Sequence, residues 1–341
     1  MTEQTATETA TSIQWHLVRR PVGEPTGEDI VRVEAELPPL ADGEVRVRNE
    51  FLSVDPYMRG RMNDMRSYIP PFVLGEVMTG GAVGTVVASR AEGLSVGDVV
   101  VHDLGWRDVS QADAREFRPA RVPDGLPSSL ALSVLGVTGF TAWIGLKLVA
   151  GVREGDVVFV SGAAGAVGSM VGQLARLMGA SRVIGSAGTT EKVGLLTKRY
   201  GFDAGFDYTE GGIARSLRSA APDGIDVYFD NVGGEHLEAA LRSFNDGGRA
   251  ALCGAISVYN ATSDPGVKYL SNVITRGLTL SGFTIVNYWS HLPAFAADMR
   301  GWLADGLITW DETVGDGIGA TFDAFTGVMN GANIGKMIVR L

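Results

Sequence analysis

The chain has 341 residues, of which 45% are hydrophobic and 20% are charged, a composition typical of a soluble globular protein. Its length predicts about two domains, each able to bury a core without disulfides or metals. The 29 basic and 39 acidic residues give a net charge of −10, which argues against binding a nucleic-acid backbone. A single cysteine, Cys253, excludes an intrachain disulfide and the cysteine-rich zinc patterns.

The N-terminal segment, residues 1–14, is polar, acidic and rich in threonine, which is unlike a secretory signal. We expect a short disordered lead-in followed by a first strand near residues 15–19. Two uncharged runs, residues 125–146 and 157–175, approach the length of a membrane span, but glycines interrupt both of them. The sequence therefore predicts no membrane span and a cytoplasmic location.

The part of the chain before about residue 135 has the pattern of a β-rich domain. Short β-rich runs lie at residues 44–54 and 82–89, and Gly, Pro and Asp turns separate such runs. Turns that lead into strands are predicted at residues 42–45 and 96–101.

Strands then alternate with helices, which predicts an α/β fold with a doubly wound parallel sheet. The predicted strands are residues 156–162, 182–188, 204–208, 225–230 and 248–254, and the predicted helices are 166–180, 190–201, 213–222 and 234–244. The tail adds helices at residues 292–306 and 322–331 and a final strand at 335–341.

A glycine-rich turn between the first of these strands and its helix is the strongest chemical signal. Gly165 and Gly168 fit the second and third glycines of the dinucleotide-binding fingerprint, whose first position is Ala163 here. Such a turn places a pyrophosphate on the N–H groups at the start of a helix. The alternative is a glycine turn that serves packing alone.

The residues that follow the next strand indicate which dinucleotide binds. An NAD site carries a carboxylate about 20 residues after the last glycine. Here the strand ends in Ser186, Ala187 and Gly188, and Lys192 follows. Small residues leave room for a 2′-phosphate and a lysine pairs with it, so the sequence predicts NADPH. The alternative is that Lys192 is a solvated helix charge.

The order of a β-rich part, a nucleotide-binding part and a returning tail resembles the medium-chain dehydrogenase/reductase superfamily. Its alcohol dehydrogenases hold zinc with cysteines and histidines. This chain has one cysteine, and its histidines (His16, His102, His236 and His291) lack the spacing of metal ligands. We therefore predict that the protein binds no zinc.

Three motifs narrow the resemblance: VDPYMRGRM at 54–62, FDNVGGE at 229–235 and CGAISVYN at 253–260. They resemble the zinc-independent prostaglandin reductase/leukotriene hydroxydehydrogenase family, which includes plant alkenal double-bond reductases and bacterial curcumin reductases. The segment SYIPP at 67–71 is closer to the bacterial branch.

The resemblance implies two domains and a homodimer. Residues 1–135 and 311–341 would form a GroES-like catalytic domain, and residues 136–310 would form a Rossmann NADP-binding domain. Residues 275–282 have the pattern of a strand late in the sheet, whose edge could pair with the same edge of a second copy.

The resemblance also implies the residues that contact the cofactor. The pyrophosphate would lie on the glycine turn, the 2′-phosphate beside a lysine and a tyrosine, and the nicotinamide ribose beside residues 253–259. Asn231 would face the cofactor, although its position equally suits an N-cap of the next helix. The expected contacts are Gly165, Ala166, Val167, Gly168, Lys192, Tyr208, Asn231, Cys253, Gly254, Ala255, Ile256, Ser257, Tyr259, Phe283 and Asn333.

The reaction implied is the reduction of the C=C bond of an α,β-unsaturated ketone or aldehyde. Hydride goes to the β-carbon, and an O–H donor stabilises the charge that develops on the carbonyl oxygen. Tyr259 is the first candidate donor and Tyr68 the second, while Tyr57, Tyr68 and Tyr288 are candidates for substrate binding. Aromatic packing is the alternative role for Tyr57 and Tyr68.

Two other functions fit the same glycine turn, although VDPYMRGRM at 54–62 with AISVYN at 255–260 favours enone reduction over quinone reduction. One is NADPH-dependent quinone reduction, which zinc-independent relatives with a similar glycine turn perform. The other is a non-catalytic NADPH-binding protein. The enone substrate itself is a small molecule that the sequence leaves unnamed.

Overall fold

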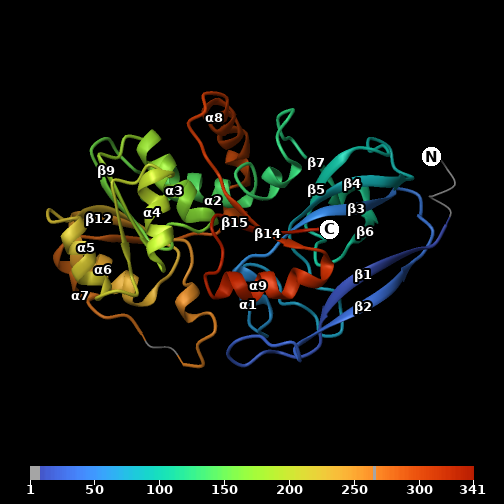
Figure 1. Ribbon diagram of the computed structural model, residues 1–341, viewed down its shortest axis with the longest axis horizontal. Coiled ribbons are helices and arrows are strands. Elements are labelled where there is room, and N and C mark those ends of the chain that lie inside the picture. Colours follow the sequence, from blue (N-terminus) through green and yellow to red (C-terminus); the bar gives the residue numbers. More distant parts are fainter. Residues whose placement is uncertain (1–7, 264–265) are drawn as a thin grey trace. The chain divides into compact units, whose positions relative to one another are not determined.

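The computed structural model describes residues 8–263 and 266–341, and the start of the expected disordered lead-in, residues 1–7, lies outside this part of the chain. The chain divides into two compact units (Figure 1). The first unit comprises the described residues up to Gly136 together with Thr313–Ala332 and Met337–Leu341. The second unit comprises Val137–Glu312 and Asn333–Lys336.

The first unit is built mainly of antiparallel strands. Strands β1 (Ala10–Leu17) and β2 (Ile30–Leu37) pair with each other. A second sheet has the order β14-β15-β3-β4-β5-β7, and β6 pairs with β3. These strands are β3 (Glu44–Ser53), β4 (Ala82–Ser89), β5 (Val99–His102), β6 (Val109–Asp113), β7 (Arg118–Pro119), β14 (Glu312–Asp316) and β15 (Lys336–Arg340).

The inward-facing side chains of three of these strands form one of the apolar clusters of the first unit. Val45 and Val47 of β3 pack with Val86 of β4 and Val100 of β5, and all four are buried. The helical segments are α1 (Tyr57–Arg61), α9 (Thr321–Met329) and the short 3₁₀ turns η2 (Ala114–Glu116), η3 (Ser128–Leu132) and η8 (Ile318–Ala320).

The second unit contains a six-stranded parallel sheet in the order β10-β9-β8-β11-β12-β13. Its strands are β8 (Val157–Val160), β9 (Arg182–Ala187), β10 (Ala204–Asp207), β11 (Ile225–Asp230), β12 (Phe244–Leu252) and β13 (Thr279–Gly282). Its helices are α2 (Val137–Ile144), α3 (Ala166–Leu177), α4 (Thr190–Lys198), α5 (Ile213–Ala220), α6 (Gly234–Ser243), α7 (Ser271–Thr275) and α8 (Leu292–Ala304). The remaining turns are the π-helical η4 (Gly145–Ala150) and the 3₁₀ turns η5 (Ile256–Val258), η6 (Ile285–Asn287) and η7 (Trp289–His291).

Helices cover both faces of this sheet. Ile184 of β9 packs in one cluster with Leu217 of α5 and Leu241 of α6. The next residue, Gly185, points the other way, where a side chain would meet Leu196 of α4. This is the doubly wound arrangement, and it confirms the predicted fold class. The strand order reverses between β8 and β11, so the residues that follow these two strands border the crevice in which such folds bind ligands.

Several element boundaries differ from the predicted ones. The first strand is Ala10–Leu17 and not residues 15–19, because its pairing with β2 extends the ladder toward the N-terminus. The predicted strand at 275–282 is wrong in its first part, where α7 ends at Thr275 and Gly277 turns the chain with a positive φ. The strand predicted at 248–254 begins earlier, at Phe244.

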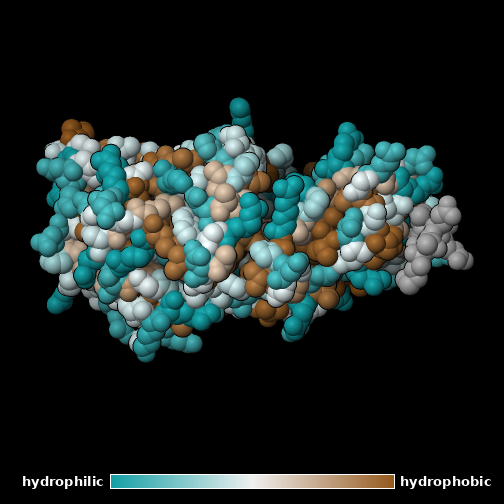
Figure 2. Space-filling view, turned by 90° about the horizontal axis from the view of Figure 1, so that it is seen from above, coloured by the Kyte–Doolittle hydropathy of each residue, from teal (hydrophilic) through white to brown (hydrophobic). Residues whose placement is uncertain are grey.

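Among the helices of the described residues, none is both long and apolar enough to span a bilayer. The face drawn in Figure 2 mixes hydrophilic residues with separate hydrophobic patches.

Candidate active site

The turn after β8 leaves the first N–H groups of α3 without a side-chain cap. Gly165 is the N-cap residue of α3, and no side chain accepts a hydrogen bond there. Gly162 turns the chain with φ 59°. A Cβ on Gly168 would lie 2.3 Å from the Gly162 carbonyl oxygen, so only glycine lets the helix start against the turn. Uncapped N–H groups at the positive end of a helix are suited to an anion, and the turn fits a pyrophosphate.

The small residues that end β9 lie beside Tyr208, and Lys192 follows them in α4. Tyr208 follows β10, donates its N–H to the Ala187 carbonyl (3.0 Å), and its hydroxyl lies where a side chain on Gly188 would be. Lys192 is half-buried in the first turn of α4, and burial lowers the pKa of its ammonium group. A cation at a helix N-terminus opposes the helix dipole. A lysine at this position is suited to pair with an anionic ligand.

Two buried polar atoms at this end of the sheet have no hydrogen-bond partner within the described part of the chain: Ser186 Oγ and His236 Nε2. Ser186 is fully buried, and His236 packs edge-on against Tyr208 with ring centroids 5.1 Å apart. Burial lowers the pKa of His236 to about 4, so the ring is neutral at pH 7. Leaving such atoms unsatisfied costs about 1–3 kcal/mol each.

A buried carboxylate that the sequence analysis missed organises the end of β11. Asp230 is 2% exposed, and its Oδ1 accepts hydrogen bonds from Tyr228 OH (2.6 Å), Gly233 N (2.7 Å), Val232 N (2.9 Å) and Ser161 Oγ (3.2 Å). Burial raises the pKa of Asp230, although these hydrogen bonds oppose the shift. Asp230 therefore holds the end of β11 to Ser161, which directly follows β8, beside the crevice. The sequence signal that could have revealed Asp230 is an acidic residue at the end of an apolar strand.

Asn231, next along the chain, is not an N-cap. Its Nδ2 donates to the Ser161 carbonyl at 2.8 Å, whereas the N-cap residue of α6 is Gly233. The alternative role considered from the sequence is therefore wrong. Asn231 links the turn after β11 to the turn after β8.

The structure brings the predicted segment 253–259 against the turn after β11. The N–H groups of Cys253 (2.9 Å) and Gly254 (3.0 Å) donate to the Asp230 carbonyl, and Ser257 N donates to the Val232 carbonyl at 3.1 Å. Ile256 N donates to the carbonyl of Asn231 at 3.4 Å.

Tyr259 turns its hydroxyl back toward its own loop. Its OH accepts a hydrogen bond from Ala255 N at 3.2 Å, so the hydroxyl proton is directed elsewhere. Burial raises the pKa of Tyr259, and the hydrogen bond from Ala255 opposes that shift. The side chain is therefore a neutral O–H donor at pH 7.

Phe283 and Tyr288 lie together after β13. Their rings meet edge to face with centroids 6.4 Å apart, and Phe283 also packs on Phe229 of β11 at 6.2 Å. Asn333 lies on the return of the chain and donates through Nδ2 to the Gly335 carbonyl at 2.7 Å. Gly335 N in turn donates to the Ala164 carbonyl at 2.8 Å, which places this return beside the glycine turn.

Tyr57 and Tyr68 belong to the first unit, and Arg61 lies close to both of them. Burial and the negative charge of Asp55 raise the pKa of Tyr57, and Tyr68 is close enough to add to the rise. The Arg61 guanidinium hydrogen-bonds Tyr57 and donates to the Pro70 carbonyl at 3.0 Å. Tyr68 is 51% exposed.

No group of three or more His, Cys, Asp or Glu residues in the described ranges is arranged to hold a metal ion. His102 is buried, and its Nε2 lies 2.9 Å from Asn49 Oδ1 while its ring packs edge-on against Phe117. It is a packing residue.

Two family models match the chain. Residues 13–120 match the N-terminal domain of oxidoreductase, and residues 166–300 match the zinc-binding dehydrogenase domain.

Relatives cover nearly the whole chain. Prostaglandin reductase 1 of Bos taurus is 41% identical over 96% of this chain and 98% of its own length. The NADPH-dependent curcumin reductase of Escherichia coli is 37% identical, with 96% of each chain covered. The crystal structure of CurA from Vibrio vulnificus in complex with NADPH is 41% identical, with a TM-score of 0.91 over 97% of this chain and 99% of that one. The chain therefore belongs to the family of prostaglandin reductase 1 and curcumin reductase, within the medium-chain dehydrogenases/reductases.

Proposed function

We propose that the protein is an NADPH-dependent reductase of the C=C bond of α,β-unsaturated ketones and aldehydes. The observation that carries the proposal is the half-buried Lys192 at the start of α4, which follows a strand end that has no carboxylate and packs on Tyr208. This arrangement suits the 2′-phosphate of NADPH, and the relatives named for curcumin and prostaglandin reduction support the substrate class. When bound, NADPH supplies the hydride for the β-carbon of the substrate.

The cofactor contacts follow from the residues at the carboxyl ends of the strands. The N–H groups of Ala166, Val167 and Gly168 would hold the pyrophosphate, and Gly165 leaves its approach open. Asn231, the 253–259 loop, Phe283 and Asn333 would hold the nicotinamide end.

Tyr259 would donate its hydroxyl proton toward the carbonyl oxygen of the substrate as negative charge develops there. The hydrogen bond from Ala255 N supports this role, because it occupies a lone pair of the hydroxyl and stabilises the phenolate form. Tyr68 is the second candidate donor, and Tyr57 and Tyr288 would contact substrate.

We propose further that the enzyme is zinc-independent, cytoplasmic and a homodimer. The single cysteine and the buried, hydrogen-bonded His102 support the first point. The position of β13 at the edge of its sheet supports the third. The catalytic domain would comprise residues 1–135 and 311–341, and the NADP-binding domain would comprise residues 136–310.

The direct test is stopped-flow oxidation of NADPH with alkenals, alkenones, curcumin, oxo-prostaglandins and quinones. The proposal expects turnover with conjugated enones and little with quinones. Turnover with quinones alone would favour quinone reduction, and binding of NADPH without any turnover would favour a non-catalytic role.

A further inference from the structure

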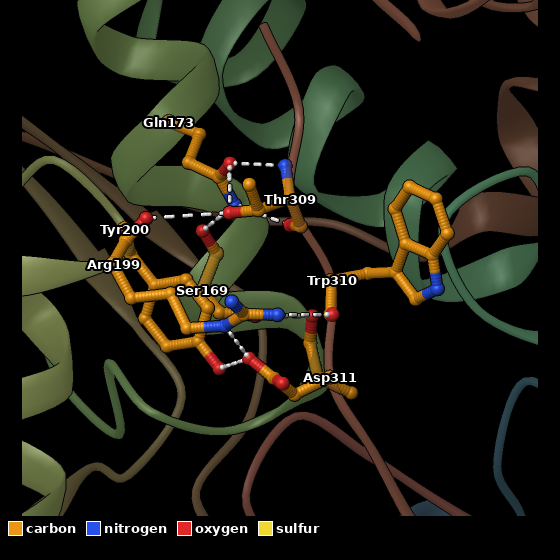
Figure 3. A network of polar contacts seen from close by, with 8 residues as sticks. Ser169, Gln173, Arg199, Tyr200, Thr309, Trp310 and Asp311 are labelled. Atoms are coloured by element: carbon orange, nitrogen blue, oxygen red, sulfur yellow. Dashed lines mark hydrogen bonds and ion pairs between the residues drawn. The ribbon is translucent and has the colours of Figure 1, made fainter. Parts of the chain in front are cut away.

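Residues 309–311, which follow α8, are fastened to α3 by a buried amide. Gln173 is 7% exposed, and its Oε1 accepts from Thr309 N at 2.8 Å while its Nε2 donates to the Thr309 carbonyl at 2.9 Å. The same Nε2 donates to the Ser169 carbonyl at 3.0 Å, one helical turn from the glycine turn (Figure 3). The segment is thereby held in register along α3.

Asp311 connects this segment to the end of α4. Its Oδ2 accepts a hydrogen bond from Tyr200 OH at 2.6 Å and an ion-paired hydrogen bond from Arg199 Nε, as Figure 3 shows. Arg199 also donates to the Trp310 carbonyl at 3.1 Å. Tyr200 is 1% exposed, and burial together with the Asp311 carboxylate raises the pKa of its hydroxyl. The charged Arg199 and the buried Tyr200 therefore both hold the same oxygen of Asp311, Oδ2.

The backbone of Asp311 reaches the glycine turn through Gly335. The Asp311 carbonyl accepts from Lys336 N at 2.9 Å, and a Cβ on Gly335 would lie 1.9 Å from that same oxygen. Gly335 has φ 62° and donates its N–H to the Ala164 carbonyl at 2.8 Å. Asp311 thus sets the position of Gly335, and Gly335 pairs with the residue that precedes Gly165.

We propose that Asp311 is a positioning residue for NADPH binding: anchored by Arg199 and Tyr200, it holds Gly335 against the glycine turn in the geometry that accepts the pyrophosphate. This inference rests on the proposed function. It adds a determinant of cofactor affinity that itself touches no cofactor, because Asp311 acts through Gly335 and Ala164.

A second ion pair of the same unit provides a matched control. The side chains of Asp311 and Arg199 are 30% and 43% exposed, and those of Asp203 and Arg176 are 31% and 40% exposed. Asp203 also accepts from a backbone N–H, that of Val183, at 2.7 Å. Val183 lies at the start of β9, whereas the cofactor residues follow the ends of the strands. Asp311 and Asp203 are therefore similar in exposure and in ion pairing, but Asp311 lies near the glycine turn and Asp203 lies at the opposite end of the strands.

The experiment compares Asp311→Asn with Asp203→Asn. NADPH affinity is measured by fluorescence titration of the cofactor-free protein, and thermal unfolding is measured without cofactor. We expect Asp311→Asn to raise the Kd for NADPH roughly 3- to 30-fold, with the KM for NADPH rising more than kcat falls. Asp203→Asn should lower the melting temperature similarly and leave the Kd within about twofold. Equal Kd values for Asp311→Asn and the wild type, or equal losses in both variants, would overturn the proposal.

Hydrogen exchange of the cofactor-free protein tests the same link without NADPH. Peptides that cover residues 333–336 should exchange faster in Asp311→Asn than in the wild type, and should be unchanged in Asp203→Asn. Unchanged exchange in Asp311→Asn would contradict the proposal. A wild-type protein that does not bind NADPH would instead contradict the proposed function. If Asp311→Asn does not fold, Tyr200→Phe removes one donor to the same oxygen, and a Kd equal to that of the wild type would again overturn the proposal.

Discussion

Lys192 is the residue on which the choice of cofactor depends in the proposed function. Removing a charge-assisted hydrogen bond to the 2′-phosphate costs about 1.5–3 kcal/mol, or roughly 10- to 150-fold in affinity. We expect Lys192→Ala to raise the KM for NADPH by that factor and to leave NADH kinetics nearly unchanged. Steady-state kinetics with both cofactors make the comparison.

Lys198, in the last turn of the same helix, is the control for that variant. It is exposed, and a cation at this end of α4 favours the helix dipole. Lys198→Ala should leave the KM for NADPH unchanged, and Lys192→Ala should unfold at the wild-type temperature or slightly above it. Equal losses with NADPH and NADH in Lys192→Ala would point to a packing role.

Tyr259 is the residue proposed to donate the proton. Losing such a donor typically lowers kcat about 10²- to 10³-fold. Because water or a ribose hydroxyl can substitute, we expect roughly a 10- to 100-fold loss for Tyr259→Phe, with NADPH affinity retained. Tyr269→Phe is the control, since Tyr269 is 43% exposed and packs on Arg242 through its ring. A wild-type kcat for Tyr259→Phe on several enones would remove this tyrosine from the reaction.

The proposed role of Lys192 could be predicted from the sequence, because it depends only on the residue type and on its distance along the chain from the glycine turn. Asp230 and Asp311 could not be predicted in the same way. Only the fold brings Gly335 beside Asp311 and Ser161 beside Asp230, although Asp230 also accepts from the neighbouring Val232 N–H. Asn231 shows the converse, since its spacing suited an N-cap that the fold assigns to Gly233.

The turn between β8 and α3 is the element proposed to hold the pyrophosphate, and Gly165 at its end and Gly168 in the first turn of α3 should respond differently to substitution. A Cβ on Gly168 would lie 2.3 Å from the Gly162 carbonyl oxygen and 2.8 Å from Ala163 Cα. A Cβ on Gly165 would lie 3.3 Å from the Gly162 oxygen, which a small adjustment relieves. We expect Gly168→Ala to lower the free energy of unfolding by about 1–3 kcal/mol, because helix and turn must separate.

Gly165→Ala should fold nearly as stably as the wild type but bind NADPH more weakly, because the added methyl group covers the path of the pyrophosphate. Thermal unfolding without cofactor and fluorescence titration with NADPH separate the two effects. A Gly165→Ala protein with wild-type affinity would show that the pyrophosphate lies elsewhere.

Elements of the second unit were predictable because each parallel strand is a short apolar run between helices with apolar faces. The bounds of β11, Ile225–Asp230, coincide with the prediction. The prediction failed where tertiary contacts set the boundary, as in β1, whose length depends on pairing with β2. The π-helical turn η4 was not predicted, and the close approach of Phe229 to Gly145 at its start is a contact that no local pattern encodes.

For the whole molecule, the position of β13 at the edge of the six-stranded sheet bears on assembly. An unpaired strand edge is available to a second copy. We expect a mass of twice 36.0 kDa by light scattering at micromolar concentration. A monomer mass at that concentration would contradict the proposed homodimer.

Metal content is a second property of the whole molecule. With one cysteine and with His102 committed to Asn49 and the Leu104 N–H, no ligand set for zinc is evident within the described ranges. Elemental analysis should find far less than one zinc per chain, and a chelator should leave turnover unchanged. Stoichiometric zinc would refute the zinc-independent assignment.

The central claim is that the enzyme saturates the C=C bond of an enone and leaves the carbonyl intact. The measurement that tests it most directly is identification of the product by mass spectrometry and NMR after turnover of an α,β-unsaturated ketone with NADPH. The account predicts a saturated ketone, because the charge that develops on the oxygen is stabilised by a hydroxyl donor while hydride enters at the β-carbon. An allylic alcohol as the product would contradict it.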